Sequence, residues 1–178
     1  MTVATPHSIT DRMLGALRFD EAIYEEVEAD TTATGQAAFV VVGSSAAAAA
    51  GNALAFGGAA DYGLIVGIAE LIGWALYAWF AYLIGAKFFK APQTTSTWGE
   101  LARTLGFANT PRFLLFFVFV PGLSGLVRTV TGLWVLVATV VALRSALDCG
   151  TGRAVVVGIV AAMVQLVVIG IAISALGG

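Results

Sequence analysis

Residues 154–176 read AVVVGIVAAMVQLVVIGIAISAL, a run of twenty-three residues without a charged side chain. An α-helix rises about 1.5 Å per residue, so this run is long enough to cross the roughly 30 Å hydrocarbon core of a bilayer. Inside a bilayer every backbone N–H and C=O needs a partner within the protein, and an α-helix supplies nearly all of them. The run therefore predicts a membrane-spanning helix.

Four further apolar segments precede it, at about residues 36–56, 62–86, 113–127 and 129–147. Hydrophobic residues make up 59% of the 178 residues and charged residues only 11%, whereas an ordinary soluble domain carries about 25% charged residues. A soluble fold of this length would lack the charges needed to cover its surface. We predict an all-α polytopic transmembrane bundle of about five spans over residues 36–178, surrounded by a lipid bilayer.

The third segment, 113–127, is short for a span. It has fifteen residues between Arg112 and Arg128, and Pro121 interrupts it. Fifteen residues of α-helix rise about 22 Å, which is less than the thickness of the bilayer core. Three arrangements fit this length: the arginine side chains snorkel to the surface, the bilayer thins locally, or the third and fourth segments form a shallow helical hairpin inside the bundle.

Residues 1–35 form an acidic tail. They hold seven acidic residues against Arg12 and Arg18, a net charge of −5, whereas the whole chain carries −2. Such a tail has no electrostatic attraction to nucleic acid. Thr10 or Asp11 can cap a first short helix and Asp20 a second. We expect amphipathic helices that pack against the bundle, because apolar side chains recur at three-to-four spacing opposite most of the acids, at Met13, Leu14, Leu17, Tyr24 and Val27.

The lysine and arginine residues predict the orientation. If all five segments cross, Arg128 lies alone on one side, and the other side receives Arg12, Arg18, Lys87, Lys90, Arg103, Arg112, Arg144 and Arg153. Positively charged segments near spans stay in the cytoplasm. We expect a cytoplasmic N-terminus and an external C-terminus in a multi-pass membrane protein.

The polar connection between the second and third segments contains a helix-start signal. Thr97 and Glu100 have the spacing of a capping box, which predicts a short helix at about 98–106 near the membrane surface. Glycines mark close packing in the first two segments, since Gly63 and Gly67 have a GxxxG spacing and Gly51 follows a run of alanines. We expect these three glycines to serve helix packing, within the chain, with further copies of it, or with other membrane proteins.

Polar residues inside the apolar segments are the candidate ligand or ion sites. Glu70 lies about 12 Å from the outer end of the second segment, where an unpaired charge costs several kcal/mol. It is either an ion, proton or ligand site, or a carboxyl group hydrogen-bonded within the bundle. Arg128 is the candidate partner, so we predict coupled destabilisation on removing Glu70 or Arg128. Asn52 and Gln165 are expected to form interhelical hydrogen bonds, with ligand contacts as the alternative.

The sequence shows no catalytic apparatus. Residues 122–125, GLSG, match the GxSG of rhomboid intramembrane proteases, but the serine needs a base and the single histidine, His7, lies in the tail. These small residues are better interpreted as a turn beside Pro121. Nucleotide-binding loops and metal-ligand clusters are absent as well. We predict a non-enzymatic protein without cofactor or metal, and we interpret Cys149 as an inert loop thiol.

Three local patterns point to a known family. They are DEAIYEEV at residues 20–27, WGELARTLGFA at 98–108 followed by Thr110 and Pro111, and GLW at 132–134. With the five-segment layout, they resemble the prokaryotic branch of the Yip-domain family of five-helix membrane proteins, from about Arg12 to the end of the chain. The resemblance implies a membrane helical bundle. Eukaryotic members interact with Rab-type GTPases in vesicle traffic and membrane shaping, but their Asp-Leu-x-Gly-Pro type signature is not found before the first segment here.

Three functions follow as hypotheses. The first is a scaffold or accessory subunit of a membrane complex that binds other membrane proteins through small-residue helix faces. The second is a small transport or channel component that uses Glu70, Asn52 and Gln165 as a polar path. The third, which rests on the family resemblance, is a GTPase-docking trafficking factor.

Overall fold

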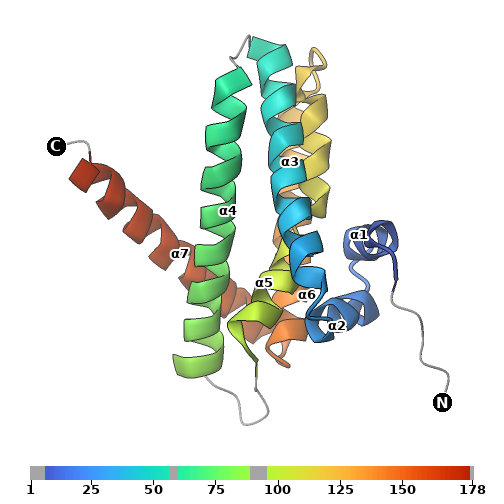
Figure 1. Cartoon of the computed structure of the whole chain (residues 1–178), viewed down its shortest axis with the longest axis vertical. Helices are drawn as coiled ribbons and strands as arrows, with labels where there is room; N and C mark the ends of the chain where they lie inside the picture. The colour runs from blue at the N-terminus through green and yellow to red at the C-terminus, as the bar shows by residue number, and fades with distance from the viewer. Residues whose placement is uncertain (1–6, 57–59, 89–95, 177–178) are drawn as a thin grey trace.

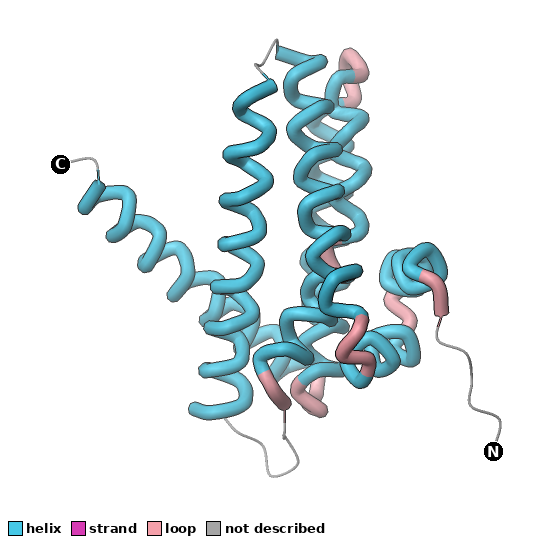
Figure 2. The backbone as a smooth tube through the Cα atoms, viewed as in Figure 1, coloured by secondary structure: helices cyan, strands magenta, loops and turns pink. Residues whose placement is uncertain are grey.

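The computed structural model describes residues 7–56, 60–88 and 96–176, and describes side chains for all of these except 56, 60–69, 169–170 and 172–176. Within these ranges the chain is helical, joined by short turns, and contains no strand (Figure 2). The helices are α1 (Ile9–Leu17), α2 (Glu21–Ala29), α3 (Ala33–Phe56), α4 (Ala60–Tyr82), the π-helix η1 (Leu83–Phe88), α5 (Trp98–Phe107), the 3₁₀-helix η2 (Thr110–Phe119), α6 (Ser124–Ala146) and α7 (Thr151–Leu176). The all-α prediction is confirmed.

The long helices α3, α4 and α6 form an upright bundle with η2, and α7 diverges from it. Helices α1, α2 and α5, which together we call the cap, gather at one end of the bundle (Figure 1). We call this the tail end and the opposite end the far end. Helix α3 runs from the tail end to the far end, α4 returns, η2 runs outward beside α3, and α6 returns beside η2. Helix α7 then diverges from the bundle at a steep angle.

Among the described residues, four helices are long and apolar enough to cross a membrane. They cover Ala33–Ala55, Glu70–Phe88, Ser124–Ala146 and Thr151–Val168. The fifth apolar element, η2, has ten residues of 3₁₀-helix, which rise roughly 20 Å. This length is shorter than the bilayer core of about 30 Å. Helix η2 begins beside α1 of the cap and extends toward the far end. About five apolar elements therefore build the bundle, and η2 is the one of partial depth.

The boundary between the third and fourth segments differs from the prediction. The prediction placed it at Arg128, but the chain turns at 120–123, and α6 begins at Ser124 and runs through Arg128. Pro121 lacks a backbone N–H, and Gly122 adopts a φ of +79° that is unstrained only for glycine. Pro121 and Gly122 therefore separate η2 from α6. Arg128 lies within α6, and its side chain donates a hydrogen bond to Asn52. The interpretation of residues 122–125 as a turn is thus close, although its last two residues start α6.

The cap is joined to the bundle by one hydrophobic core. Tyr24 and Val27 of α2, Leu101 and Phe107 of α5 and Leu143 of α6 are buried members of the same cluster. Burial of side chains of this size stabilises a fold by about 1.5–3 kcal/mol each. The tail helices therefore pack against the bundle, as predicted from their amphipathic pattern.

The helix starts of the cap follow local capping rules. Asp20 caps α2 and the Thr97–Glu100 capping box starts α5, as predicted. The first cap differs: α1 starts at a capping box of Ser8 and Asp11 rather than at a cap on Thr10 or Asp11. Serine is as good a cap as aspartate, and it leaves the Asp11 carboxylate free to accept from the Ser8 backbone N–H.

Gly51 permits a close contact between α3 and η2. A Cβ atom at Gly51 would lie 2.4 Å from the carbonyl oxygens of Leu115 and Phe116, closer than any side chain tolerates. The backbones of α3 and η2 therefore touch at Gly51. The packing around Gly63 and Gly67 on α4 lies outside the described side chains.

Candidate functional site

Glu70, the acid predicted to lie inside a span, forms an ion pair within the bundle. Its two carboxylate oxygens accept from the two terminal nitrogens of Arg112, at 2.7 and 2.6 Å. Two parallel hydrogen bonds between a guanidinium and a carboxylate are the strongest geometry available to such a pair. The expected pairing of Glu70 with Arg128 is therefore wrong, because Arg112 occupies the carboxylate.

The start of η2 positions Arg112 for this contact. Helix α5 ends at Phe107, and Pro111 lies in the first turn of η2, where the missing N–H costs nothing. Nη1 of Arg112 also lies 3.3 Å from Oδ1 of Asn109. The Glu70 and Arg112 side chains remain 33% and 22% exposed. The pair joins α4 to η2 and neutralises two charges that would each be costly in a bilayer.

The other predicted polar residues form separate interhelical contacts. Asn52 on α3 accepts from Arg128 on α6 at 2.6 Å, and it donates to the carbonyl of Ala48. Gln165 on α7 donates to the carbonyl of Gly73 on α4 at 2.8 Å. The four candidate residues thus belong to three different helix contacts, and each has its own partner. Whether any of them also binds an ion or a ligand stays a prediction.

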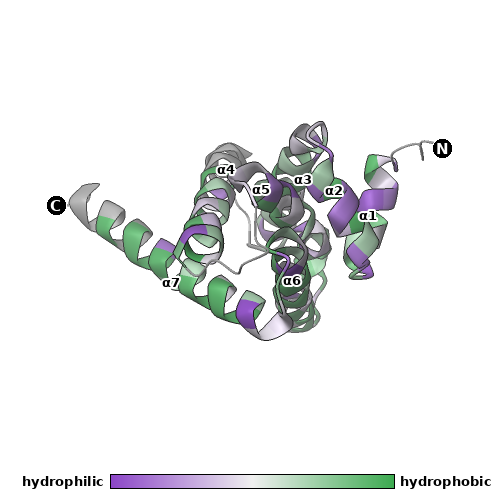
Figure 3. Ribbon diagram, turned by 90° about the horizontal axis from the view of Figure 1, so that it is seen from below, coloured by the Kyte–Doolittle hydropathy of each residue, from purple (hydrophilic) through white to green (hydrophobic). Residues whose placement is uncertain are grey.

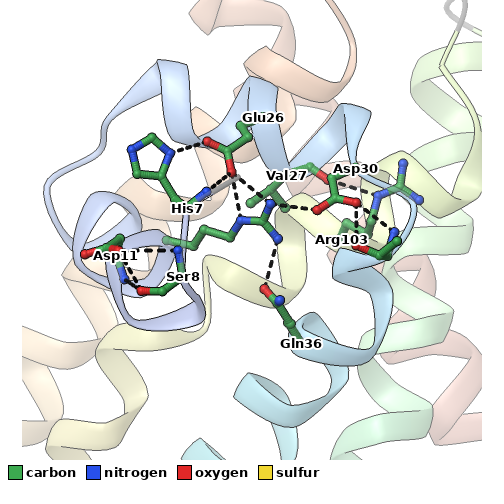
Figure 4. Close-up of polar contacts among 10 residues, drawn as sticks. His7, Ser8, Asp11, Glu26, Val27, Asp30, Gln36 and Arg103 are labelled. Carbon is green, nitrogen blue, oxygen red and sulfur yellow. Dashed lines mark hydrogen bonds and ion pairs between the residues drawn. The ribbon is translucent and has the colours of Figure 1, made fainter. Parts of the chain in front are cut away.

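The cap is organised around Arg12, a buried arginine that sequence reasoning counted only as a tail charge. Its side chain is 1% exposed. Nε and Nη2 donate to Glu26 at 3.0 and 2.8 Å, Nη2 also donates to Asp30 at 2.6 Å, and Nη1 donates to Gln36 at 3.0 Å. Figure 4 shows Glu26, Asp30 and Gln36 converging from α2, the following turn and α3. Arg12 therefore fastens α1 to α2 and to the first span.

The acid partners of Arg12 are held in their charged form. Hydrogen bonds from Thr32 and then from Arg12 lower the pKa of Asp30 to about 2. His7 contacts the second oxygen of Glu26 (Figure 4), and this hydrogen bond and the charge of Glu26 raise the pKa of His7. The excess of seven tail acids over two arginines was the available signal for this cluster, because an arginine that becomes buried when the tail folds needs carboxylate partners.

Arg103 fastens the cap from the other side. Its Nε donates to the carbonyl of Val27 at 3.0 Å, and Nη2 donates to the carbonyl of Glu28. These are carbonyls of the last turn of α2, where a cation is favoured by the helix dipole. Two tryptophans add contacts to backbone carbonyls: Trp74 on α4 donates to Ala102 at 2.9 Å, and Trp134 on α6 donates to Leu17 at 3.0 Å.

A polar cavity of about 230 Å³ lies where α2 meets the corner between α6 and α7. Glu21 and Arg144 form an ion pair of 3.0 Å at its edge. Glu28 lies near this corner, and burial, followed by the charges of Asp148 and Glu100, raises its pKa to about 7. Burial is also the main cause that raises the pKa of Cys149, which borders the cavity. The nearby arginines therefore do not turn Cys149 into a reactive thiolate.

The described residues form no group of three His, Cys, Asp or Glu side chains that could hold a metal ion. Ser124, the serine of the GxSG pattern, starts α6 at the far end, whereas His7 lies in the cap at the tail end and contacts Glu26. What the described residues build is a set of ion pairs and hydrogen bonds that join helices.

Comparison with known families decides the assignment. The family model of the Yip1 domain matches residues 15–173, which run from α1 into α7. The chain belongs to the Yip1 domain family. The family domain thus contains most of the cap as well as the bundle, so α2 and α5 are parts of the Yip1 fold in this chain. Neither a search of curated proteins nor a search of solved structures found a match.

Proposed function

We propose that this Yip1-domain protein is a non-enzymatic scaffold or accessory subunit, which binds the helix of another membrane protein in the wedge between α6 and α7. The observation that carries the proposal is a cavity of about 390 Å³ where α7 diverges from the bundle. Leu136 and Val140 of α6 form one wall, Ile159 of α7 lies on the other, and Tyr77 of α4 forms the floor.

The size and lining of the wedge suit a helix. One turn of α-helix, about 10 Å wide and 5.4 Å long, occupies roughly 400 Å³. Ala162 of α7 also borders the wedge, and a small residue there lets a partner helix approach closely in lipid. Gly158 beside it packs within the chain, because a Cβ there would meet Leu143 at 3.1 Å. Within its apolar window α7 is 17% buried, against 28–33% for the other three candidate spans. The surface of α7 is therefore the least occupied by its own chain.

The polar residues support a scaffold better than a transport path. Glu70, Asn52 and Gln165 each bond a partner within the chain, in different helix pairs. A path for ions needs polar groups that follow one another along a hydrated cavity, and the wedge is lined almost entirely by apolar side chains.

A substitution that fills the wedge tests the proposal. Ala162→Phe places a ring in the wedge, and Val137→Phe is the matched control, because Val137 is an exposed residue of α6 outside the wedge. We expect proteins that co-purify with the tagged chain in mild detergent to be lost from the Ala162→Phe variant and retained by Val137→Phe. A wild-type chain that purifies as a lone monomer, or co-purification that Ala162→Phe leaves unchanged, would contradict the proposal.

We further propose that the tail end faces the cytoplasm of a prokaryotic cell. Support comes from the charges, because Lys87, Arg144 and Arg153 lie at the end that carries the cap, and Arg128 lies toward the other end. A Cys149→Ala background, which removes the single cysteine, allows a direct test. A membrane-impermeant maleimide should label a cysteine placed at the exposed Gly150 only after permeabilisation, and one placed at the exposed Leu123 in intact cells. Reversed labelling would overturn the orientation.

A further inference from the structure

Helix α1 packs only partly against the bundle. A groove of about 250 Å³ separates it from the hairpin formed by η2 and α6. Met13, Leu14 and Leu17 line the side of α1, and Phe113, Leu114 and Trp134 line the side of the hairpin. Only apolar atoms face into the groove, since the hydroxyl of Thr110 at its edge is bonded to the carbonyl of Phe107.

An exposed arginine, Arg18, directly follows Leu17, the last residue of α1 that lines the groove. Leu14 is 45% exposed at the outer edge of α1. Arg18 follows four residues later, on the same side of the helix, and its side chain is exposed. Among the described residues, none forms a hydrogen bond or ion pair with the Arg18 side chain. Arg12, by contrast, points to the opposite side of α1, where it is buried against α2.

The acidic residues near Arg18 are already engaged. Asp11 accepts from the hydroxyl of Ser8 at 2.6 Å, and Asp20 accepts from the backbone N–H of Ala22 at 3.0 Å. The exposed face of α1 therefore offers an apolar strip and a free guanidinium side by side. Figure 3 shows this alternation of hydrophobic and hydrophilic residues on α1, whereas α6 and α7 are more uniformly hydrophobic.

The size of the groove selects the occupant. The groove, about 250 Å³, is smaller than one turn of α-helix, which occupies roughly 400 Å³, so its size favours a thinner occupant than a helix. A single hydrocarbon chain is thinner and flexible. The hairpin wall includes α6, which is long and apolar enough to span a bilayer, so lipid is the solvent at the open side of the groove. Arginine binds phosphate through paired hydrogen bonds.

We propose that the groove between α1 and the η2–α6 hairpin binds one acyl chain of a phospholipid, and that Arg18 binds the phosphate of the same lipid. The lipid belongs to the leaflet on the side of the cap. Binding holds α1 at the membrane surface and covers the apolar strip of Leu14 and Leu17. The proposal rests on the membrane location of the bundle and is independent of the partner proposed for the α6–α7 wedge.

A photoactivatable lipid tests the proposal. The full chain in detergent is incubated with increasing amounts of a phospholipid that carries a diazirine midway along one acyl chain, irradiated and digested for mass spectrometry. We expect labelling in α1 and in the peptides that contain Phe113 or Trp134, saturating at one lipid per chain. Labelling spread over α6 and α7 without saturation would overturn the proposal.

Variants and a second lipid separate the two contacts. Arg18→Gln should weaken binding about tenfold, the loss expected for a charge-assisted contact, and Arg18→Lys should restore part of it. Leu14→Gln should weaken binding as well, whereas Leu123→Gln should not, because Leu123 is equally exposed, 44%, at the far end. A diazirine diacylglycerol, which lacks the phosphate, should bind wild type and Arg18→Gln alike. Saturable labelling that neither Arg18→Gln nor Leu14→Gln weakens would refute this site.

Discussion

The Glu70–Arg112 ion pair gives the sharpest test of the bundle. Replacing Glu70 by Gln keeps the shape of the side chain and leaves the Arg112 guanidinium without a counter-charge. Breaking a buried ion pair by removing one partner costs about 3–5 kcal/mol. The two side chains are 33% and 22% exposed, so solvent or lipid headgroups recover part of this cost. We expect Glu70→Gln and Arg112→Gln each to reduce the free energy of unfolding by about 2 kcal/mol.

A double-mutant cycle turns this expectation into a measurement. Unfolding in increasing mole fractions of SDS, followed by helical circular dichroism, gives the stability of the wild type, both single variants and the double variant. Because each single variant leaves one unpaired charge and the double variant leaves none, the double variant should lose about 1–2 kcal/mol less than the sum of the single losses. A coupling energy within about 0.5 kcal/mol of zero, the limit of additivity, would refute the pairing.

The same cycle with Arg128 separates the structure from the sequence-based expectation. Arg128 bonds Asn52 and not Glu70. Glu70→Gln and Arg128→Gln should therefore be additive within about 0.5 kcal/mol. Strong coupling of Glu70 to Arg128, without coupling to Arg112, would show that the Arg112 side chain does not reach Glu70 from η2.

Three further predictions concern the cap and the bundle contact of η2. Arg12→Gln should destabilise the cap by about 3 kcal/mol, because it leaves Glu26 and Asp30 without their shared arginine. It should speed hydrogen exchange of α1 and α2, whereas Arg18→Gln, at the exposed arginine that follows α1, should not do so in detergent without added lipid. The pKa of Glu28 in the fold, about 7, lies above its ordinary value of 4.5, so its contribution to cap stability is complete below pH 4.5 and is lost as pH rises through 7. Hydrogen exchange of the α2 amides, corrected for intrinsic rates, should therefore be faster at pH 8 than at pH 6. The comparison is made in a His7→Gln background, so that the titration of His7 does not contribute. If adding Glu28→Gln leaves the difference between pH 8 and pH 6 unchanged, the assignment to Glu28 is wrong. Gly51→Val should destabilise the chain by more than about 2 kcal/mol, because its side chain meets the carbonyls of Leu115 and Phe116; Gly125→Val, with open space around a Cβ, is the control, and equal losses would argue against the α3–η2 contact.

Part of this fold could be predicted from local sequence. The apolar runs predict the membrane helices, because in lipid a helix satisfies its own backbone and needs only length and absence of charge. Asp20 and the Thr97–Glu100 pair predict helix starts, since a cap acts within three residues. The motifs at residues 20–27 and 98–108 indicate the Yip family, and the family match over residues 15–173 confirms it.

The partners of the charged residues were decided only by tertiary structure. Arg112 and Arg128 both flank the third segment, and nothing local distinguishes them as partners of Glu70, which lies 42 residues before Arg112. The choice depends on where the chain turns. Pro121 and Gly122 place the turn before Arg128, so Arg128 lies in α6, whereas Arg112 lies in the first turn of η2, from which its side chain reaches Glu70 on α4.

The role of Arg12 shows the same limit. The sequence by itself determined that the tail is acidic, amphipathic and helical. It did not determine that Arg12 would be buried among Glu26, Asp30 and Gln36, because these partners come from three elements whose relative positions depend on packing. Local backbone bonding and apolar run length act over a few residues and can be read along the chain, whereas ion pairs between helices arise only once the helices have been placed side by side.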